Sequence, residues 1–312
     1  MIDRRVSDYY KTISRDNLAL SRQFCYDPLE EIEQDYEVSD PLDENRYMVV
    51  PQLIHRYKDR VLLLVTNECR LYCRHCFRRE YVGGGNSHIN KTELKAALDY
   101  IKNNELIHEV ILSGGDPLVL GYKALGRILK DIKSIRKNIV IRIGTRVPIV
   151  DPTFITDSMV SMLAENTPIF MAIQCNHPSE LTVEVKNILD KLSSAGVVLL
   201  NQAVLLKGIN DSVEIQKELC HKLLEVRVKP YYLFQGDLAK GTSHFRVPLG
   251  KGLEIYSKLR DEVSGIALPI YAVDIPGGGG KVPLNGSFIE SEDEDFYYLK
   301  NSVGFIGKYP KE

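Results

Sequence analysis

Three of the six cysteines fall within eight residues, as Cys69, Cys73 and Cys76 in the segment TNECRLYCRHCFRRE (66–80). Thiolates this close along a chain can converge on one iron–sulfur cluster or on one zinc ion. Structural zinc normally takes four protein ligands, and the nearby candidate for a fourth is His75. Because His75 directly precedes Cys76, little backbone remains to turn both side chains onto one ion. A four-iron cluster on three thiolates would instead leave one iron open for chemistry.

Two glycine-containing motifs add further chemical possibilities. SGGDP (113–117) follows an apolar segment, and PGGGGK (276–281) places Lys281 after four glycines. A run of glycines is entropically costly and adds no packing, which favours a role in wrapping a phosphate or a ring with backbone N–H groups. A partly buried lysine can have a lowered pKa and act as an imine-forming nucleophile. Taken alone, the two motifs would be a strand-to-helix turn and an exposed hairpin with a surface lysine.

The elements that must position these groups begin after Pro51. Predicted strands cover 61–66, 108–113, 138–145, 169–175, 197–205, 229–235 and 268–274. Predicted helices cover 90–104, 122–135, 157–165, 183–194, 212–226 and 251–263. Strands that are apolar on both faces, separated by amphipathic helices, indicate parallel β/α architecture, either a doubly wound sheet or a barrel. In both, ligands gather at the C-terminal ends of the strands.

The two ends of the chain differ from this repeating middle. Residues 1–50 are predicted to form an N-terminal extension, with a helix around Tyr10–Arg22 and an extended surface arm over the acidic residues 27–46. We expect residues 51–284 to form the β/α unit that carries these motifs. Residues 285–312 are acidic and then aromatic (SEDEDFYYLK), and we expect a short docked tail.

Composition limits the class of protein. The chain has 312 residues, 44% of them hydrophobic and 26% charged, so it can bury a substantial core without disulfides or metals. The net charge of −2 argues against a nucleic-acid partner held by bulk charge. No apolar run is long enough to span a membrane, and the first residues lack a secretory signal. We therefore expect a cytoplasmic protein with reduced cysteines and no membrane partner.

The motifs together resemble a known family. The C-x3-C-x2-C spacing after the first core strand resembles the signature of the radical S-adenosylmethionine (SAM) superfamily. The blocks LIHRYKDRVLLLVTNECRLYCRHCFRRE, RIGTRVPIVDPTFIT, NHPSELT, NQAVLLKGIND, PYYLFQGDLAKGTSHFRVP and VDIPGGGGKVPL are similar to successive blocks of the lysine 2,3-aminomutase family, from roughly Asp40 to Leu284. The resemblance implies an α/β fold with a partial (β/α)6-type radical SAM barrel, an N-terminal extension and a short C-terminal tail. It also implies three cofactors: a [4Fe-4S] cluster, SAM and pyridoxal 5′-phosphate.

The resemblance assigns cofactor contacts residue by residue. The three cysteines would bind the cluster, and Lys281 would form the Schiff base with pyridoxal phosphate. Gly114, Gly115 and Asp116 would meet the methionine amino group of SAM, with glycine allowing close backbone approach to the ligand. Three more residues are predicted to contact cofactors, with the arginines as pyridoxal-phosphate anchors: Arg56, Arg60 and Gln202.

It assigns substrate contacts in the same way. Arg78, just beyond the third cysteine, would hold the substrate carboxylate by planar bidentate contact. Asp237 and Asp274 would hold the distal ammonium of lysine, since a buried cation needs carboxylate partners. Four arginines flank the cysteines and suit an anionic cluster or anionic substrate groups: Arg70, Arg74, Arg78 and Arg79.

The activity implied is migration of the α-amino group of L-lysine to Cβ, giving β-lysine, with an electron donor such as flavodoxin or ferredoxin. Relatives acting on arginine or glutamate, or on lysine destined for translation elongation factor P, are alternatives. The two aspartates disfavour glutamate, and the intact VDIPGGGGK block favours free lysine. A non-enzymatic alternative is a structural iron–sulfur or zinc module that binds a partner.

The chain also departs from the family pattern. Ser212 stands where relatives carry a cysteine that helps bind zinc, and the three C-terminal zinc cysteines are missing. We therefore expect any homo-oligomer to form without zinc bridging. Gln174 and Cys175 replace a histidine–aromatic pair, and His177 either lines the site or is a hydrogen-bonded structural histidine.

Overall fold

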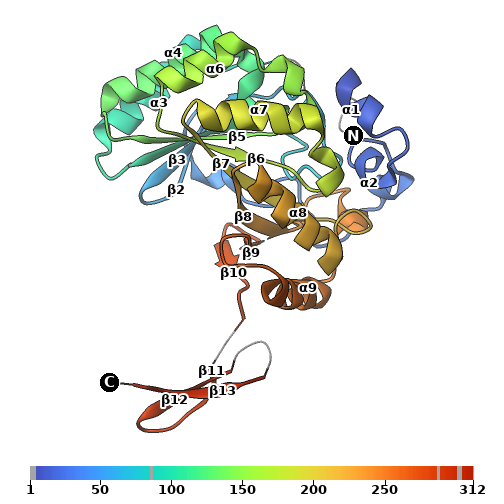
Figure 1. The fold of residues 1–312 in the computed structure, drawn as a ribbon. Coiled ribbons are helices and arrows are strands. Elements are labelled where there is room, and N and C mark those ends of the chain that lie inside the picture. The colour runs from blue at the N-terminus through green and yellow to red at the C-terminus, as the bar shows by residue number, and fades with distance from the viewer. Residues whose placement is uncertain (1–4, 85–86, 287–288, 301–303, 312) are drawn as a thin grey trace.

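The structure is a computed structural model that describes residues 5–84, 87–286, 289–300 and 304–311. Its main feature is a 10-stranded sheet in which the strands follow one another in sequence order, from β1 to β10 (Figure 1). A doubly wound sheet would reverse its strand order part of the way across. The sheet begins at β1 and ends at β10 without closing, so it is the partial barrel expected from the sequence.

The bounds of the elements follow the predicted pattern closely. The strands of the main sheet are β1 (Met48–Val50), β2 (Leu53–Tyr57), β3 (Arg60–Thr66), β4 (Glu109–Gly114), β5 (Val140–Thr145), β6 (Ile169–Ile173), β7 (Val197–Leu205), β8 (Val228–Gln235), β9 (Ile270–Ile275) and β10 (Gly280–Pro283). The α-helices are α1 (Asp8–Ile13), α2 (Leu18–Ser21), α3 (Lys91–Asn103), α4 (Gly121–Ile135), α5 (Val147–Val150), α6 (Asp157–Glu165), α7 (Val183–Ser194), α8 (Val213–Glu225) and α9 (Leu249–Glu262). Short 3-10 helices are η1 (Pro28–Glu31), η2 (Glu44–Tyr47), η3 (Pro117–Leu120), η4 (Pro152–Phe154), η5 (Pro178–Glu180) and η6 (Ser243–Phe245).

Strands β3 to β9 are parallel and coincide with the seven predicted strands. Helices α3, α4, α6, α7, α8 and α9 connect them and lie outside the curved sheet (Figure 1). Each connection therefore returns the chain to the same edge, which brings the C-terminal ends of all seven strands together. Among the described residues, no helix is both long and apolar enough to cross a membrane.

Alternation along the strands separates the core from the inside of the barrel. In β5, Ile141 and Ile143 are fully buried, whereas Arg142 and Gly144 line an internal cavity. Successive side chains of a strand point to opposite faces, so one face packs under the helices and the other faces inward. The inner face is thus more polar than the apolar-on-both-faces pattern that we expect from the sequence.

The N-terminal extension corrects two expectations. The stretch expected to be helical around Tyr10–Arg22 contains two short helices, α1 and α2, rather than one, and the Asn17 side chain caps the second by accepting the N–H of Leu20. The acidic segment is also more than a surface arm, because Glu30 is buried and accepts hydrogen bonds from Arg74 and Arg79. Two arginines compensate for the burial of this carboxylate.

The C-terminal residues form a separate three-stranded antiparallel sheet, with β11 (Ile289–Glu292), β12 (Phe296–Lys300) and β13 (Ile306–Pro310). In the described part of the chain none of these strands pairs with the main sheet, and Figure 1 shows the small sheet standing apart from it. Apolar side chains such as Phe305 and Tyr309 are exposed there. This arrangement differs from the docked tail expected from the sequence, because hydrogen bonding within the tail itself pairs its strands.

Candidate active site

One cavity of about 690 Å³ lies inside the barrel and at the C-terminal ends of its strands. Its volume is in the range of small-molecule sites. All thirteen residues to which the family resemblance assigns a cofactor or substrate contact line it: Arg56, Arg60, Cys69, Cys73, Cys76, Arg78, Gly114, Gly115, Asp116, Gln202, Asp237, Asp274 and Lys281. They come from segments more than 200 residues apart, so the fold brings together what the sequence separates.

The cysteine loop connects β3 to α3 and holds three free thiols. Burial raises the pKa of Cys76 to about 12, and the neighbouring Cys73 adds to this effect. Burial likewise raises the pKa of Cys69, and Asp116, Cys76 and Cys73 contribute. The three sulfurs are therefore within electrostatic reach of one another, and bound metal ions would supply the positive charge that stabilises buried thiolates.

His75 does not join the cysteines. Its ring is buried, with Nε2 3.4 Å from the amide nitrogens of Gln174 and Asn176, and its Nδ1 has no hydrogen-bond partner in the part of the chain that the structure describes. Within the described ranges, no three His, Cys, Asp or Glu side chains are arranged around a single metal ion. A four-iron cluster is larger and takes each thiolate on a different iron, so the three cysteines fit this group.

Most of the arginines that flank the cysteines have structural partners. Arg74 and Arg79 bind Glu30, and Arg70 binds Asp151 with its Nη2 2.6 Å from the carboxylate. These pairs hold the cysteine loop in place. The expectation that these arginines suit an anionic ligand is therefore wrong for Arg74 and Arg79, which bind Glu30 away from the cavity, whereas Arg70 and Arg78 line the cavity.

A different arginine, which the sequence analysis missed, reaches a cysteine. Arg146 follows β5, and its Nη1 donates to Cys73 Sγ at 2.8 Å. Its Nη2 donates to Glu180 Oε1 at 2.7 Å and also to Gln23. The side chain is buried and its Nε–H has no partner among the described residues. This arginine belongs to the RIGTR block, but nothing in its local sequence indicates contact with a loop 73 residues away.

The SGGDP segment packs against the backbone that leads into the cysteine loop. A Cβ atom on Gly114 would lie 2.2 Å from the carbonyl oxygen of Thr66, and one on Gly115 would lie 2.2 Å from that of Glu68. The chain's own backbone, just before Cys69, thus approaches these glycines closely, which is a reason for glycine besides the expected approach to a ligand. Their contact with SAM stays a prediction.

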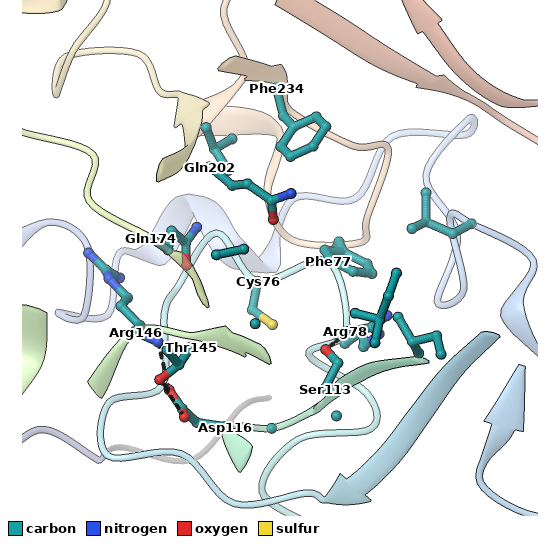
Figure 2. A pocket seen from close by; sticks show the side chains of 18 of the residues that line it. Cys76, Phe77, Arg78, Ser113, Asp116, Thr145, Arg146, Gln174, Gln202 and Phe234 are labelled. Carbon is teal, nitrogen blue, oxygen red and sulfur yellow. Dashed lines mark hydrogen bonds between the residues drawn. The ribbon is translucent and has the colours of Figure 1, made fainter. Parts of the chain in front are cut away.

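Asp116 is fully engaged within the protein. Its carboxylate accepts the hydroxyl of Thr145 at 2.7 Å and the backbone N–H groups of Arg146, Val147 and Leu118 (Figure 2). Burial raises the pKa of Asp116, while these hydrogen bonds act in the opposite direction. The carboxylate therefore fastens the end of β4 to the end of β5, where the cavity lies.

Lys281 lies on β10, directly opposite Asp274 on β9. Its Nζ donates to Asp274 Oδ2 at 2.9 Å and lies 4.6 Å from the centre of the Phe234 ring. The glycine run forms the turn between the two strands, with positive φ at Gly277, Gly278 and Gly280. The segment is thus a hairpin, as in the simpler interpretation, but its lysine faces the cavity.

The two predicted substrate aspartates meet in the cavity. Burial raises the pKa of Asp237 to about 7, and the nearby Asp274 contributes to the shift. Lys281 and Arg78 act in the opposite direction. Two carboxylates that face one buried space form a site for a cation, because a bound positive charge would relieve their repulsion.

Arg78 is held by a residue that the sequence analysis missed. Its Nε and Nη2 donate to the carboxylate of Glu44 at 2.7 and 2.6 Å, and its Nη1 donates to Ser113 Oγ at 2.8 Å (Figure 2). The Arg78 side chain is 11% exposed and that of Glu44 is 18% exposed. Glu44 comes from η2, in the segment expected to be a surface arm.

Arg56 and Arg60 lie beside Tyr57 on the side of the cavity near Lys281. The Arg60 guanidinium stacks 3.9 Å from the centre of the Tyr57 ring, and Tyr57 Oη accepts the N–H of Lys281 at 3.3 Å. Arg56 Nη2 is buried and has no hydrogen-bond partner in the described structure. A buried donor without a partner next to Lys281 fits a phosphorylated ring compound such as pyridoxal phosphate.

The other residues that the sequence analysis singled out have either a place in the cavity or a structural role. Gln174 and Gln202 line the cavity (Figure 2). His177 caps η5, and its Nδ1 accepts the N–H of Ser179, so the structural interpretation of this histidine is confirmed. Ser212 caps α8 by accepting the N–H of Ile215.

Comparisons with known proteins agree with this site. Residues 63–218 match the family described as the radical SAM superfamily, and residues 256–312 match that described as lysine-2,3-aminomutase. The chain is 47% identical to an L-lysine 2,3-aminomutase of Methanococcus maripaludis, over 88% of this chain and 64% of that protein. It is 42% identical to a glutamate 2,3-aminomutase of Clostridioides difficile, over 90% of this chain and 67% of that protein. The chain thus spans less than two thirds of the length of the first of these relatives.

A solved structure shares the fold at low sequence identity. A radical SAM methyltransferase from Sphaerobacter thermophilus superposes with a TM-score of 0.52 at 18% identity, over 71% of this chain and 68% of that one. This likeness concerns the fold of the barrel alone.

Proposed function

This chain belongs to the lysine 2,3-aminomutase family of the radical SAM superfamily, and from that membership we propose that it moves the α-amino group of L-lysine to Cβ, giving β-lysine. Superfamily membership implies SAM and a [4Fe-4S] cluster, and pyridoxal phosphate is part of the proposal. It also places the chain among enzymes rather than among structural iron–sulfur or zinc modules.

The observation that carries the proposal is the set of charges in one cavity. Arg78 offers N–H groups for an α-carboxylate, and Asp237 with Asp274 offers carboxylates for a distal cation. Lys281 is close to both aspartates, because its amine donates to Asp274 and its charge lowers the pKa of Asp237. An amino acid with a cationic side chain matches this pattern, whereas the distal carboxylate of glutamate would be repelled.

The cluster and SAM would supply the radical that takes a hydrogen atom from Cβ, and pyridoxal phosphate would carry the migrating nitrogen. Cys69, Cys73 and Cys76 would hold the cluster, and Lys281 with the unpartnered donor of Arg56 would hold pyridoxal phosphate. The protein's own contribution is to fix the amino acid at both ends and to keep water from the reacting carbon. Asp116 contributes indirectly, since it fastens the strand ends beside the cysteine loop.

The remaining parts of the proposal concern partners and location. An electron donor such as flavodoxin or ferredoxin would reduce the cluster. Because Ser212 stands where a zinc-binding cysteine is expected, any homo-oligomer would form without zinc bridging, and the protein would act in the cytoplasm. These three points stay predictions.

Anaerobic turnover with a panel of amino acids tests the proposal. Reconstituted protein with SAM, pyridoxal phosphate and a reductant is incubated with lysine, arginine or glutamate, and β-isomers are separated by chromatography. We expect β-lysine from the wild type and none from Lys281→Ala, and Cys69→Ala should lose 5′-deoxyadenosine formation as well. A β-isomer formed only from glutamate, or 5′-deoxyadenosine formation retained in Cys69→Ala, would contradict the assignment.

A further inference from the structure

A short segment of the N-terminal extension, residues 40–47, crosses from the surface to the cavity, and we call it the strap. Its turn is built locally, because the Asp40 carboxylate accepts the backbone N–H groups of Glu44 at 2.9 Å and of Asn45 at 3.0 Å. The strap then continues into η2, with Glu44 and Tyr47 lining the cavity. Glu44 is thus presented to the cavity by a preformed turn.

The strap has an anchor that does not involve Glu44. Tyr47 Oη donates to the carbonyl oxygen of Gly278 at 3.1 Å, and the ring lies 5.5 Å from the Arg56 guanidinium. These contacts attach the strap to the glycine turn before Lys281. The strap is therefore attached to the barrel by contacts of Tyr47 as well as by the contact between Glu44 and Arg78.

The contact between Glu44 and Arg78 uses one edge of the guanidinium. A guanidinium has five N–H donors in a fixed plane. Glu44 takes the Nε–H and one N–H of Nη2, and Ser113 takes one N–H of Nη1. One N–H on each terminal nitrogen is left, and Arg78 lines the cavity. When Ser113 accepts the N–H of Nη1 that faces the side-chain stem, the two remaining N–H groups lie side by side at the end of the guanidinium and can bind a carboxylate while the other edge stays on Glu44.

We propose that Glu44 is a positioning residue for substrate recognition: it holds Arg78 by one edge so that the remaining N–H groups of the guanidinium receive the α-carboxylate of the amino acid. This inference rests on the proposed function in that it takes an amino acid as the ligand. Before the amino acid binds, Glu44 also neutralises a buried guanidinium that would otherwise lack a carboxylate partner. The substrate then meets an arginine that is already charged and already oriented, which reduces the entropy cost of binding.

A binding experiment with two matched ligands tests the inference. L-Lysine and L-lysine amide differ only in the α-carboxylate, and their dissociation constants are measured by titration calorimetry on anaerobically reconstituted protein without SAM, so that no turnover occurs. Glu44→Gln keeps the shape of the side chain and removes its charge. Glu33→Gln is the control, since Glu33 belongs to the same extension but pairs with Lys240 at the surface.

We expect Glu44→Gln to weaken binding of L-lysine roughly tenfold and to change binding of the amide by less than about twofold. Glu33→Gln should change neither. Equal weakening of both ligands would show a merely structural role, and tighter binding of L-lysine would show that Glu44 competes with the substrate. Either result overturns the inference.

The experiment also separates this inference from the proposed function. If arginine or another amino acid binds in place of lysine, the lysine assignment fails, and the same comparison is made with that amino acid and its amide. A difference between acid and amide that depends on Glu44 would still support the positioning role. If none of lysine, arginine, glutamate and norleucine binds to the wild type, both the proposed function and the inference are wrong.

Discussion

Lysine binding should depend on pH through Asp237. Burial and the nearby Asp274 raise the pKa of this carboxyl to about 7, against the effects of Lys281 and Arg78, while Glu44 adds to the increase. A distal ammonium binds the ionised carboxylate. With a pKa of about 7, roughly nine tenths of the empty sites are ionised at pH 8 and roughly one tenth at pH 6. The apparent dissociation constant for lysine should therefore be about tenfold higher at pH 6 than at pH 8.

Calorimetric titration in buffers of different ionisation enthalpy measures both the affinity and the protons released. The sign follows from the direction of the shift. Because a bound cation favours the ionised carboxylate, binding near pH 7 should release about half a proton from Asp237. Norleucine, which has the same backbone groups but no distal ammonium, is the control ligand, and the difference between lysine and norleucine reports the distal site.

Asp237→Asn should abolish the pH dependence that distinguishes lysine binding from norleucine binding. It should also weaken lysine binding at pH 8. The empty variant should also be more stable than the wild type at pH 8, because the raised pKa of Asp237 destabilises the folded state progressively from about pH 4, where the unfolded chain loses the proton, to about pH 7, and fully above it. Below about pH 4, where the carboxyl is protonated in the folded state and largely protonated in the unfolded state, the two proteins should melt at similar temperatures. Equal lysine affinity at pH 6 and pH 8, with no proton release beyond that of norleucine, would refute the reasoning.

Two further predictions concern the cysteine loop. Gly115→Ala places a Cβ 2.2 Å from a backbone oxygen of Glu68, so the variant should lose about 1–3 kcal/mol of stability and bind less iron after reconstitution, whereas Gly84→Ala, with nothing within 4 Å, should do neither. Arg146→Lys should make the midpoint potential of the reconstituted cluster more negative, because it weakens an N–H···S hydrogen bond to Cys73. Redox titration followed by electron paramagnetic resonance measures the change, and an unchanged potential at full iron content would contradict the role of that hydrogen bond.

Sequence patterns predicted the parts of the fold that depend on local periodicity. Each of the seven parallel strands and six connecting helices lies where the spacing of apolar residues predicted it. Buried residues recur with a characteristic period in each type of element, so the sequence alone carries this signal. The antiparallel strands β1, β2 and β10 were missed, because each has only three to five residues and therefore little periodic signal of its own. The site residues that belong to continuous motifs all line the cavity.

Site residues that belong to no recognisable local motif could not be predicted from the sequence. Glu44 contacts Arg78 across 34 positions, and Arg146 contacts Cys73 across 73 positions. Both contacts depend on how segments with no local signal of their own dock against the barrel. The acidic segment around Glu44 also gives no indication that this carboxylate lies inside the protein, since runs of charged residues usually face solvent.

The β9–β10 hairpin places a numerical constraint on the glycine turn. Lys281 is opposite Asp274 only because the turn between them has its present length. One glycine more, with the rest of the pairing kept, would place the lysine opposite Val273 and rotate its amine to the other side of the sheet. The number of glycines in the turn, and not only their flexibility, thus determines where the lysine amine lies.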